Sequence, residues 1–306
     1  QRLLRRQQLL DEAIAAFNQT PVVGGPSNDD LIFRGNALRW KATAYALKAR
    51  YYMHLTRRDP KAAENALTAI ANAFTRRAEQ PTFFFGNSDN ESHPIALFGK
   101  ERPQQMVVGN FLVNMMNEKA DPRRRKYWVL ENNEAMFYKL GNTDLFWAQR
   151  NSPAPLISYT ELLFLKAEAQ LRTGQEIQAA QTFTEAIINN MEELGISAAE
   201  YNPYLAFNAG FSGLNTLEQK IQRIITQKYI AMYGQNSNEA WVDYRRTGYP
   251  LLAVPANATP SFNPSLVVPR RYLYPITERT TNRENYEAAI SQQGGHLMDV
   301  DMWAFQ

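Results

Sequence analysis

The sequence contains no cysteine. This absence excludes disulfide bonds, thiol nucleophiles and cysteine-ligated metal sites, but it does not identify a compartment. Histidine is almost as scarce, with three residues in the chain: His54, His93 and His296. So few imidazoles argue against a histidine-based catalytic triad and against a three-histidine zinc site.

Long apolar runs and a strong net charge are also absent. No stretch approaches the roughly 20 apolar residues of a membrane-spanning helix. The 33 Lys and Arg residues oppose 30 Asp and Glu residues, and the resulting charge of +3 does not favour a nucleic-acid partner. The first residues contain neither an initiator methionine nor a signal peptide, so we expect any export signal or lipid anchor upstream of Gln1.

Several catalytic signatures are missing as well. The chain lacks the P-loop, the dinucleotide-binding G-x-G-x-x-G, the zinc-binding H-E-x-x-H and the nucleophile elbow G-x-S-x-G. Residues 210–213 read Gly-Phe-Ser-Gly, one residue short of that elbow, and indicate a turn. These absences exclude the commonest nucleotide-dependent and hydrolytic enzyme classes.

What the sequence does contain is a pattern of helices. Segments rich in Ala, Leu, Glu, Gln, Lys and Arg alternate with loops that contain Pro, Gly and Asn, which predicts an all-α fold. A chain of 306 residues with 44% hydrophobic content can bury a core as one large domain or as two coupled ones. We expect a single helical domain over residues 1–306.

Two helical hairpins are predicted, at about residues 36–71 and 158–194. In the first, a helix over residues 36–56 is followed by Asp59-Pro60, which is expected to cap the next helix. In the second, Ser158 and Glu161 suit a capping box before a helix that Gly174 ends. Small residues around Phe183 give this hairpin a pattern similar to a divergent tetratricopeptide repeat.

Further helices are predicted at residues 217–233 and 238–246. The C-terminal segment 250–306 is expected to be rich in loops, because six prolines lie between Pro250 and Pro275. Residues 83–103 form a second stretch without periodicity. Long ordered loops are often functional, so both stretches are candidate positions for a binding site.

The sequence signals for a metal site are weak. Two short groups offer oxygen or imidazole ligands, namely His296 with Asp299 and Asp301, and Asp89 with Asn90 and Glu91. Ordinary polar segments contain the same residues, so we expect neither a metal site nor a cofactor.

Paired carboxylates allow a hypothesis of a helical glycosidase. The two pairs are Glu161 with Glu168, and Glu239 with Asp243. The second pair precedes Arg245 and Arg246, and a structural cluster of salt bridges explains it more easily. We therefore expect no catalytic residue.

Aromatic residues in predicted loops are the best candidates for ligand contact. Rings in irregular segments are natural platforms for sugar faces or peptide side chains. Five of them lie between the two predicted hairpins: Phe83, Phe84, Phe85, Tyr138 and Trp147.

An ordered set of motifs resembles the SusD/RagB family. Asp30-Leu31 and Gly35, followed by Trp40-Lys41 and the helix through Arg50, resembles the family's D-L-x-x-x-G … W-K-x-x-A-x-x-L-K-x-R segment. Asp121-Pro122-Arg123 resembles its D-P-R step. The other matching segments, in chain order, are Ser158–Ala169, Ile225–Tyr229, Glu239–Pro250, Pro269–Arg271, Tyr274-Pro275, Glu278, Asn282, Asn285 and Gly294-Gly295.

This resemblance implies tetratricopeptide-like hairpins in a right-handed superhelix with long irregular loops. It also implies a lipid-anchored binding protein on the outer face of an outer membrane, which captures a glycan for a SusC-like TonB-dependent transporter. A RagB-like member would bind a peptide instead. The motif residues are expected to be structural, with Glu161 as a cap, Trp241 in the core, and Arg245 and Arg246 as ties to the C-terminal segment.

The first hypothesis is therefore a nutrient-binding protein that works beside a transporter. The alternatives are the helical glycosidase and a scaffold that binds only protein through its repeat groove.

Overall fold

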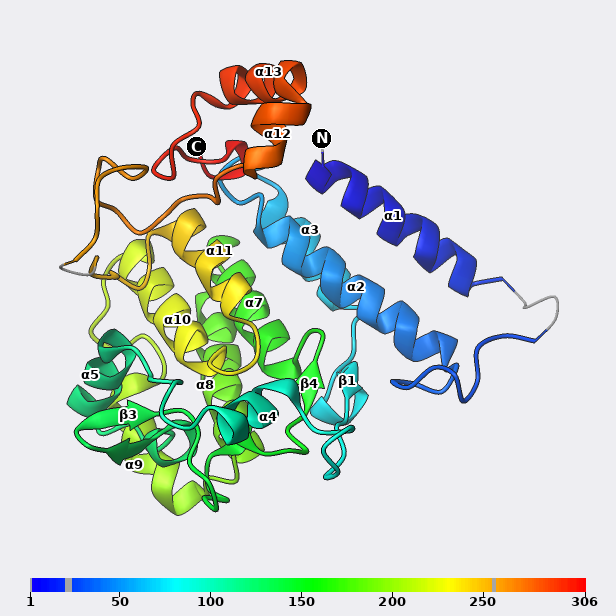
Figure 1. Cartoon of the computed structure of the whole chain (residues 1–306). Coiled ribbons are helices and arrows are strands. Elements are labelled where there is room, and N and C mark those ends of the chain that lie inside the picture. Colours follow the sequence, from blue (N-terminus) through cyan, green and yellow to red (C-terminus); the bar gives the residue numbers. More distant parts are fainter. Residues whose placement is uncertain (1, 20–23, 255–256) are drawn as a thin grey trace.

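The structure of the chain is a computed structural model, which describes residues 2–19, 24–254 and 257–306 (Figure 1). The described residues fold mainly into helices, so the predicted all-α fold is confirmed. The α-helices are α1 (Arg2–Phe17), α2 (Ala37–Met53), α3 (Ala62–Ile70), α4 (Pro94–Glu101), α5 (Asn110–Glu118), α6 (Arg124–Tyr127), α7 (Tyr159–Arg172), α8 (Glu176–Glu193), α9 (Ala198–Asn208), α10 (Leu217–Ala231), α11 (Ser237–Thr247), α12 (Ile276–Thr281) and α13 (Arg283–Gln293).

Short strands and 3-10 helices connect these elements. Strand β1 (Thr82–Phe83) pairs antiparallel with β4 (Ala154–Pro155), and β2 (Val129–Glu131) pairs antiparallel with β3 (Glu134–Met136). Thr82 lies opposite Pro155, and Val129 lies opposite Met136. The 3-10 helices are η1 (Arg77–Glu79), η2 (Phe146–Ala148) and η3 (Trp303–Phe305).

Both predicted hairpins are present, as α2–α3 and α7–α8. The Ser158 hydroxyl accepts a hydrogen bond from the Glu161 amide at 3.1 Å, as the cap signal predicts. The prediction of a full capping box is wrong, because the Glu161 carboxylate binds the guanidinium of Arg50 instead. In the first hairpin the helix α3 begins at Ala62, beyond the predicted Asp59-Pro60 start.

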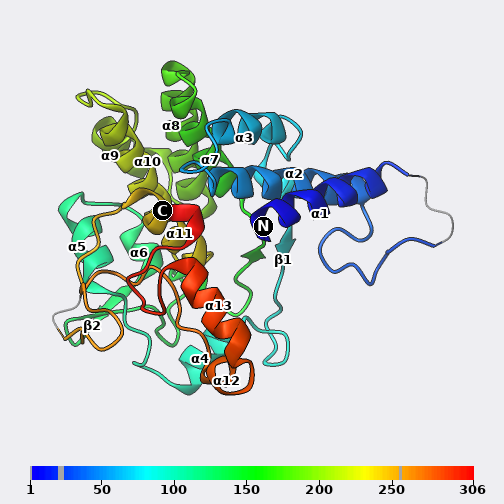
Figure 2. The same ribbon diagram turned by 90° about the horizontal axis from the view of Figure 1, so that it is seen from above.

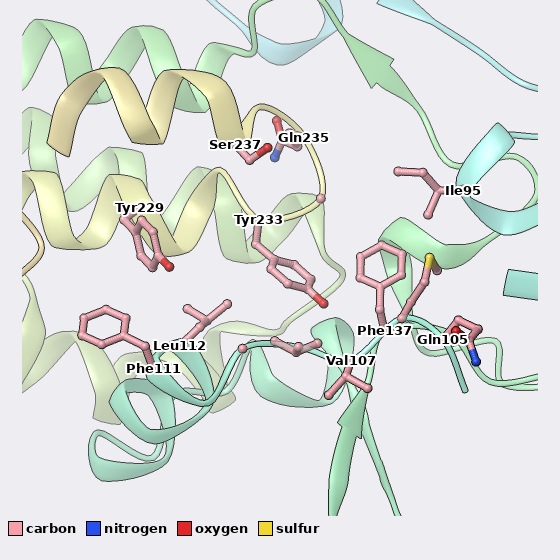
Figure 3. A pocket seen from close by; sticks show the side chains of 14 residues that line it. Ile95, Gln105, Val107, Phe111, Leu112, Phe137, Tyr229, Tyr233, Gln235 and Ser237 are labelled. Carbon is pink, nitrogen blue, oxygen red and sulfur yellow. The ribbon is translucent and has the colours of Figure 1, made fainter. Parts of the chain in front are cut away.

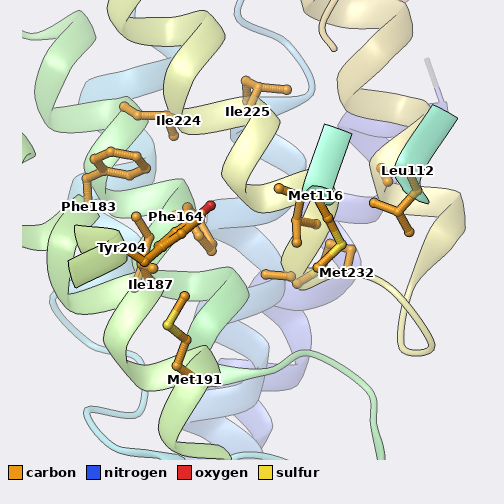
Figure 4. Close-up of a cluster of buried hydrophobic side chains, with 14 of the residues drawn as sticks. Leu112, Met116, Phe164, Phe183, Ile187, Met191, Tyr204, Ile224, Ile225 and Met232 are labelled. Atoms are coloured by element: carbon orange, nitrogen blue, oxygen red, sulfur yellow. The ribbon is translucent and has the colours of Figure 1, made fainter. Parts of the chain in front are cut away.

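Helix α7 is the centre of the structure. One side of it, with Phe164 and Ala167, joins a large core that also includes α5, α8, α10 and η2 (Figure 4). The other side, with Leu165 and Ala169, joins a second core against α2 and α3. Viewed from above, α1, α2 and α3 lie in succession beside α7 and α8 (Figure 2). Buried alanines allow this close approach of neighbouring helices.

Charged side chains are buried between α2, α7, α10 and α11. We call these residues the buried ion network: Arg50, Glu161, Glu168, Lys228, Asp243 and Arg246. Arg50 pairs with Glu161 at 2.7 Å, and Lys228 pairs with Asp243 at 2.7 Å. Arg246 binds both Glu168 and Asp243 through Nη2 at 2.7 Å. The network thus ties the first hairpin to the second, and the second to α11.

The C-terminal segment packs against α11 through arginine. Arg245 stacks on the Trp241 ring and donates a hydrogen bond to the carbonyl of Arg270, as expected for a tie to this segment. The prediction that Arg246 also ties this segment is wrong, because its guanidinium pairs with Glu168 of α7. Beyond residue 275, α12 and α13 contain no buried residue and project from the body (Figure 1).

The two predicted irregular stretches differ. Among the described residues of 250–275 there is neither a helix nor a strand, as predicted, although residues 255–256 lie outside the described part. Residues 83–103 contain the helix α4, which the sequence did not predict. Its start is fixed by Pro94 at the first turn and by the His93 ring, whose Nδ1 accepts the amide of Ile95 at 3.2 Å.

Candidate ligand-binding site

A cavity of about 600 Å³ lies between α4, α5, β3 and the turn that joins α10 to α11 (Figure 3). It is mostly apolar, and four aromatic rings form its walls. We call it the aromatic cavity, and its lining residues are Ile95, Gln105, Met106, Val107, Val108, Gly109, Phe111, Leu112, Phe137, Tyr229, Tyr233, Gly234, Gln235 and Ser237.

Backbone hydrogen bonds fix the wall that precedes α5. The Val108 amide donates to the Ala135 carbonyl at 2.7 Å, and the Phe137 amide donates to the Met106 carbonyl at 2.9 Å. Residues 105–109 are therefore held as an extended segment beside β3. This pairing places Phe137 next to Val107 at the mouth of the cavity (Figure 3).

The opposite wall comes from α10. Tyr229 and Tyr233 are four residues apart, so both rings project from one side of the chain. Phe111 meets Tyr229 edge to face with 6.1 Å between ring centroids, and Phe137 meets Tyr233 at 5.5 Å. Each aromatic wall residue is thus positioned by a ring from the facing element.

The two tyrosine hydroxyls differ in availability. Tyr233 donates its hydroxyl proton to the Tyr127 carbonyl at 2.9 Å, and its ring stacks on that of Tyr127. Tyr229 makes no hydrogen bond through its hydroxyl to any residue that the structure describes. Burial raises the pKa of both phenols, so both stay neutral at physiological pH. The Tyr229 hydroxyl can therefore donate to, or accept from, a ligand.

Polar groups are few in the aromatic cavity. Gln105 lies on the segment before α5, Gln235 on the turn after α10 and Ser237 at the start of α11 (Figure 3). A largely apolar, aromatic-lined hollow with a small number of polar groups is the usual form of a small-molecule site. Its chemistry suits stacking on an apolar ligand face with a few orienting hydrogen bonds.

The five aromatics predicted from sequence lie around α4, with unequal exposure. Phe83 and Phe85 meet edge to face at 4.8 Å, and Phe85 packs on the ring of His93 at 4.7 Å. Phe84 is 73% exposed and is the most accessible of the five. These rings form a cluster at the N-terminal end of α4, which also supplies Ile95 to the aromatic cavity.

Tyr138 and Trp147 lie behind the walls. Tyr138 packs directly against Gly99 of α4, where a β-carbon would collide with its ring. Trp147 is 2% exposed and packs under Gly234, which lines the aromatic cavity. The prediction of an exposed loop residue is thus wrong for Trp147, because η2 folds its ring into the main core against Phe146.

The sequence did not single out the four wall aromatics of the cavity. Phe111, Phe137, Tyr229 and Tyr233 come from three segments that meet only in the folded chain. Tyr229 ends the motif segment Ile225–Tyr229, but nothing in that motif marks it as a ligand contact. Phe137 is adjacent to the predicted Tyr138.

The paired carboxylates do not form a hydrolytic site. Glu161, Glu168 and Asp243 are buried in the ion network, and Glu239 binds the His54 ring at 2.8 Å. Although burial opposes ionisation, the guanidinium of Arg246 holds the pKa of Glu168 at about 2. His54 and Arg50 likewise hold the pKa of Glu239 at about 2, against its burial. A general acid needs a raised pKa, and neither residue has one.

Candidate metal ligands are engaged elsewhere. Asp299 accepts hydrogen bonds from Ser265, and Asp89 pairs with Lys100 and Arg150. Within the described residues, no group of three or more His, Asp or Glu side chains is arranged to hold a metal ion.

A family model described as "Starch-binding associating with outer membrane" matches residues 3–275. The chain belongs to the SusD-like family. SusD-like proteins are binding proteins and not enzymes, which agrees with the sequestered carboxylates. No curated protein matches the chain.

Solved structures agree with this membership. A SusD homologue from Bacteroides thetaiotaomicron is 26% identical, with a TM-score of 0.79 over 99% of this chain and 73% of its own. A SusD homologue from Bacteroides uniformis is 24% identical, with a TM-score of 0.80 over 98% and 71%. A chitin-binding protein is 22% identical, with a TM-score of 0.77 over 99% and 72%. They share the SusD-like fold with this chain.

The family description refers to the outer membrane. In the described ranges of the chain, no helix is both long enough and apolar enough to cross a bilayer.

Proposed function

We propose that this SusD-like protein binds an oligosaccharide in the aromatic cavity and delivers it to a SusC-like TonB-dependent transporter. The observation that carries the proposal is the cavity itself. It is a hollow of about 600 Å³ with four aromatic rings, on a scaffold whose family is described as starch-binding. A chitin-binding protein of the same fold supports a glycan as the ligand class.

The chemistry of the walls suits a sugar. A pyranose ring has an apolar face that stacks on an aromatic ring, and its hydroxyls need a few well-placed partners. Phe111 and Tyr229 provide ring faces and edges, while Gln105, Gln235 and the free Tyr229 hydroxyl provide hydrogen bonds. Phe84 and its neighbours Phe83 and Phe85 are proposed as outer contacts, and Tyr138 and Trp147 as supports behind the walls.

The family description, which refers to the outer membrane, supports a proposal for the partner and the location. We propose that the protein is held by a lipid anchor at the outer face of the outer membrane, where it hands its ligand to the transporter. Copurification of a TonB-dependent transporter with the tagged protein, from cells that produce both, would test this step.

A peptide is the second candidate ligand. The lining of the cavity is more apolar than polar, with Ile95, Val107 and Leu112 among its residues, and such a surface also accepts apolar peptide side chains. Both ligand classes therefore belong in one experiment.

Titration calorimetry with panels of neutral oligosaccharides and peptides tests the proposal. We expect binding of an oligosaccharide that Phe111→Ala weakens roughly tenfold, because one stacking ring is lost. Tyr229→Phe removes only the free hydroxyl and should cost less. Tyr272→Ala, which deletes an exposed tyrosine that does not line the cavity, is the matched control and should bind normally.

The outcomes separate the hypotheses. Binding of peptides alone would replace the glycan assignment with the peptide one. Oligosaccharide affinity that Phe111→Ala leaves unchanged would place the site outside the aromatic cavity and refute the proposal.

A further inference from the structure

A second pocket, which is polar, lies where the C-terminal end of α5 meets α10 and the end of α9. Its volume is about 360 Å³, and its polar lining includes Lys119, Asn208, Gln219, Gln222, Arg223 and Thr226. We call it the polar pocket. Thr226 of this pocket and Tyr229 of the aromatic cavity are one helical turn apart on α10. Helix α5, about 14 Å long, separates the two hollows.

Two positive charges in the polar pocket have no acidic partner. No carboxylate of the described chain lies within ion-pair distance of Lys119 or Arg223. Arg223 makes one side-chain hydrogen bond there, from Nη1 to the Gly210 carbonyl at 3.3 Å. The pocket therefore concentrates positive charge that nothing within it neutralises.

The nearest acids do not change this conclusion. Both carboxylate oxygens of Asp121 bind Arg123, at 3.0 Å and 2.6 Å. Glu118 is exposed and does not line the polar pocket. The helices α5 and α9 end here, so their partial negative charges offset part of the positive field, but two full charges outweigh them.

The hydrogen-bond inventory also has an excess of donors. The Gln219 carbonyl oxygen already accepts the amides of Asn215 and Thr216, so its NH₂ group remains available. Gln222 makes no side-chain hydrogen bond to the described residues. Arg223 has at most one of its five donors in use. The pocket also contains acceptors on Asn208, Gln222 and Thr226, but none of them is charged, and a ligand with negatively charged oxygens would pair with the two cations.

We infer that the polar pocket binds the carboxylate of an acidic ligand. Arg223 would hold the two oxygens in its planar fork, and Lys119 would add a second charge from the rim. Gln219 and Gln222 would bind neighbouring hydroxyl or carbonyl groups. Acidic sugars and the C-termini of peptides share this chemistry. The inference concerns a different pocket from the proposed function and does not depend on it.

Calorimetry with the full chain tests the inference, with four probes. They are a trisaccharide of galacturonic acid, the corresponding neutral trisaccharide of galactose, and one tripeptide with a free or an amidated C-terminus. We expect an acidic probe to bind more tightly than its neutral counterpart. Arg223→Gln should lower that affinity roughly tenfold or more, because a charge-assisted hydrogen bond is lost.

Two further variants test the second charge of the pocket and control for the loss of a charge elsewhere. Lys119→Gln removes the rim charge from an exposed position and should weaken the same probe without affecting thermal unfolding. Arg279→Gln removes the same charge from the exposed α12 and should bind like the wild type.

The result identifies the source of the carboxylate. Selective loss of galacturonate binding, or of binding to the free C-terminus, in Arg223→Gln supports the inference and names the ligand class. Acidic affinity that is unchanged in Arg223→Gln and Lys119→Gln, or the absence of any affinity for the acidic probes, overturns it. Binding of neutral oligosaccharides in the aromatic cavity has no bearing on either outcome.

Discussion

Lys228 and Tyr229 are neighbours on α10, yet they belong to two regions with opposite chemistry. Lys228 is fully inside the buried ion network, where Asp243 lies 2.7 Å from its ammonium. Tyr229 lines the aromatic cavity, and its hydroxyl has no described protein partner. The network satisfies its charges internally, whereas the cavity leaves rings and hydroxyls available. One region can hold the fold together, and the other can accept a ligand.

This difference explains what the motifs reveal. The recognisable motif segments contain all six members of the network: Arg50, Glu161, Glu168, Lys228, Asp243 and Arg246. Buried charges tolerate few substitutions because removal of one partner leaves another uncompensated. Rings of a ligand cavity can be exchanged without such a penalty. Of the four wall rings, the motif segments include only Tyr229, so they identify mainly the scaffold of this SusD-like protein.

The largest expected effect comes from breaking the network at its centre. Arg246→Met leaves Glu168 with only the partly exposed Arg172, and Asp243 with only Lys228. We expect a loss of roughly 3–5 kcal/mol in the free energy of unfolding, measured by urea titration. Arg279→Met on the exposed α12 is the matched control and should be neutral. If Arg246→Met were as stable as the wild type, the network would not be what stabilises the fold.

Lowering the pH should weaken the same buried ion network and so lower the free energy of unfolding. The folded pKa of Glu168 is about 2, below its ordinary value, so its contribution is complete above about pH 5 and is lost as the pH falls towards 2. The loss should be on the order of 3 kcal/mol. Urea unfolding across this range should show a shallower pH dependence for Glu168→Gln than for the wild type. Identical slopes would contradict the assignment.

A glycine substitution should test the support behind the cavity wall. Gly234 has φ +72° and lies over Trp147, so the methyl group of Gly234→Ala would collide with the indole ring. We expect a destabilisation of roughly 2 kcal/mol or more, together with weaker ligand binding. Gly213→Ala has a similar φ, +74°, but no neighbour within 4 Å, so it measures the backbone strain alone. Equal losses in both variants would show that Trp147 does not support the cavity wall.

The smallest effect is expected at the rim. Phe84 is 73% exposed, so Phe84→Ala should leave the free energy of unfolding unchanged while lowering glycan affinity roughly threefold. Phe207→Ala on α9, which is 81% exposed, is the control and should alter neither quantity. Unchanged affinity in Phe84→Ala would exclude this ring as a ligand contact.

The sequence predicted the scaffold better than the site, for physical reasons. Ser158 and Gly174 are local signals, and they set the ends of α7 correctly because capping depends on neighbouring backbone groups. Helix α4 has only eight residues with Gly99 inside it, which is too short for a periodic pattern.

The aromatic cavity depends on contacts between distant segments. Phe111 and Tyr229 meet only because α5 packs beside α10, and no spacing in the sequence encodes that meeting. Trp147 shows the converse error. Its loop-like surroundings suggested exposure, but η2 folds the ring into the core.

The most direct test of the account is the position of a bound oligosaccharide in a crystal of the complex. We expect a sugar ring to occupy the aromatic cavity, in contact with Phe111 and Tyr229, while the buried ion network is unchanged. A sugar bound at the surface of α11 beside Trp241 and Tyr272, with the aromatic cavity empty, would contradict it.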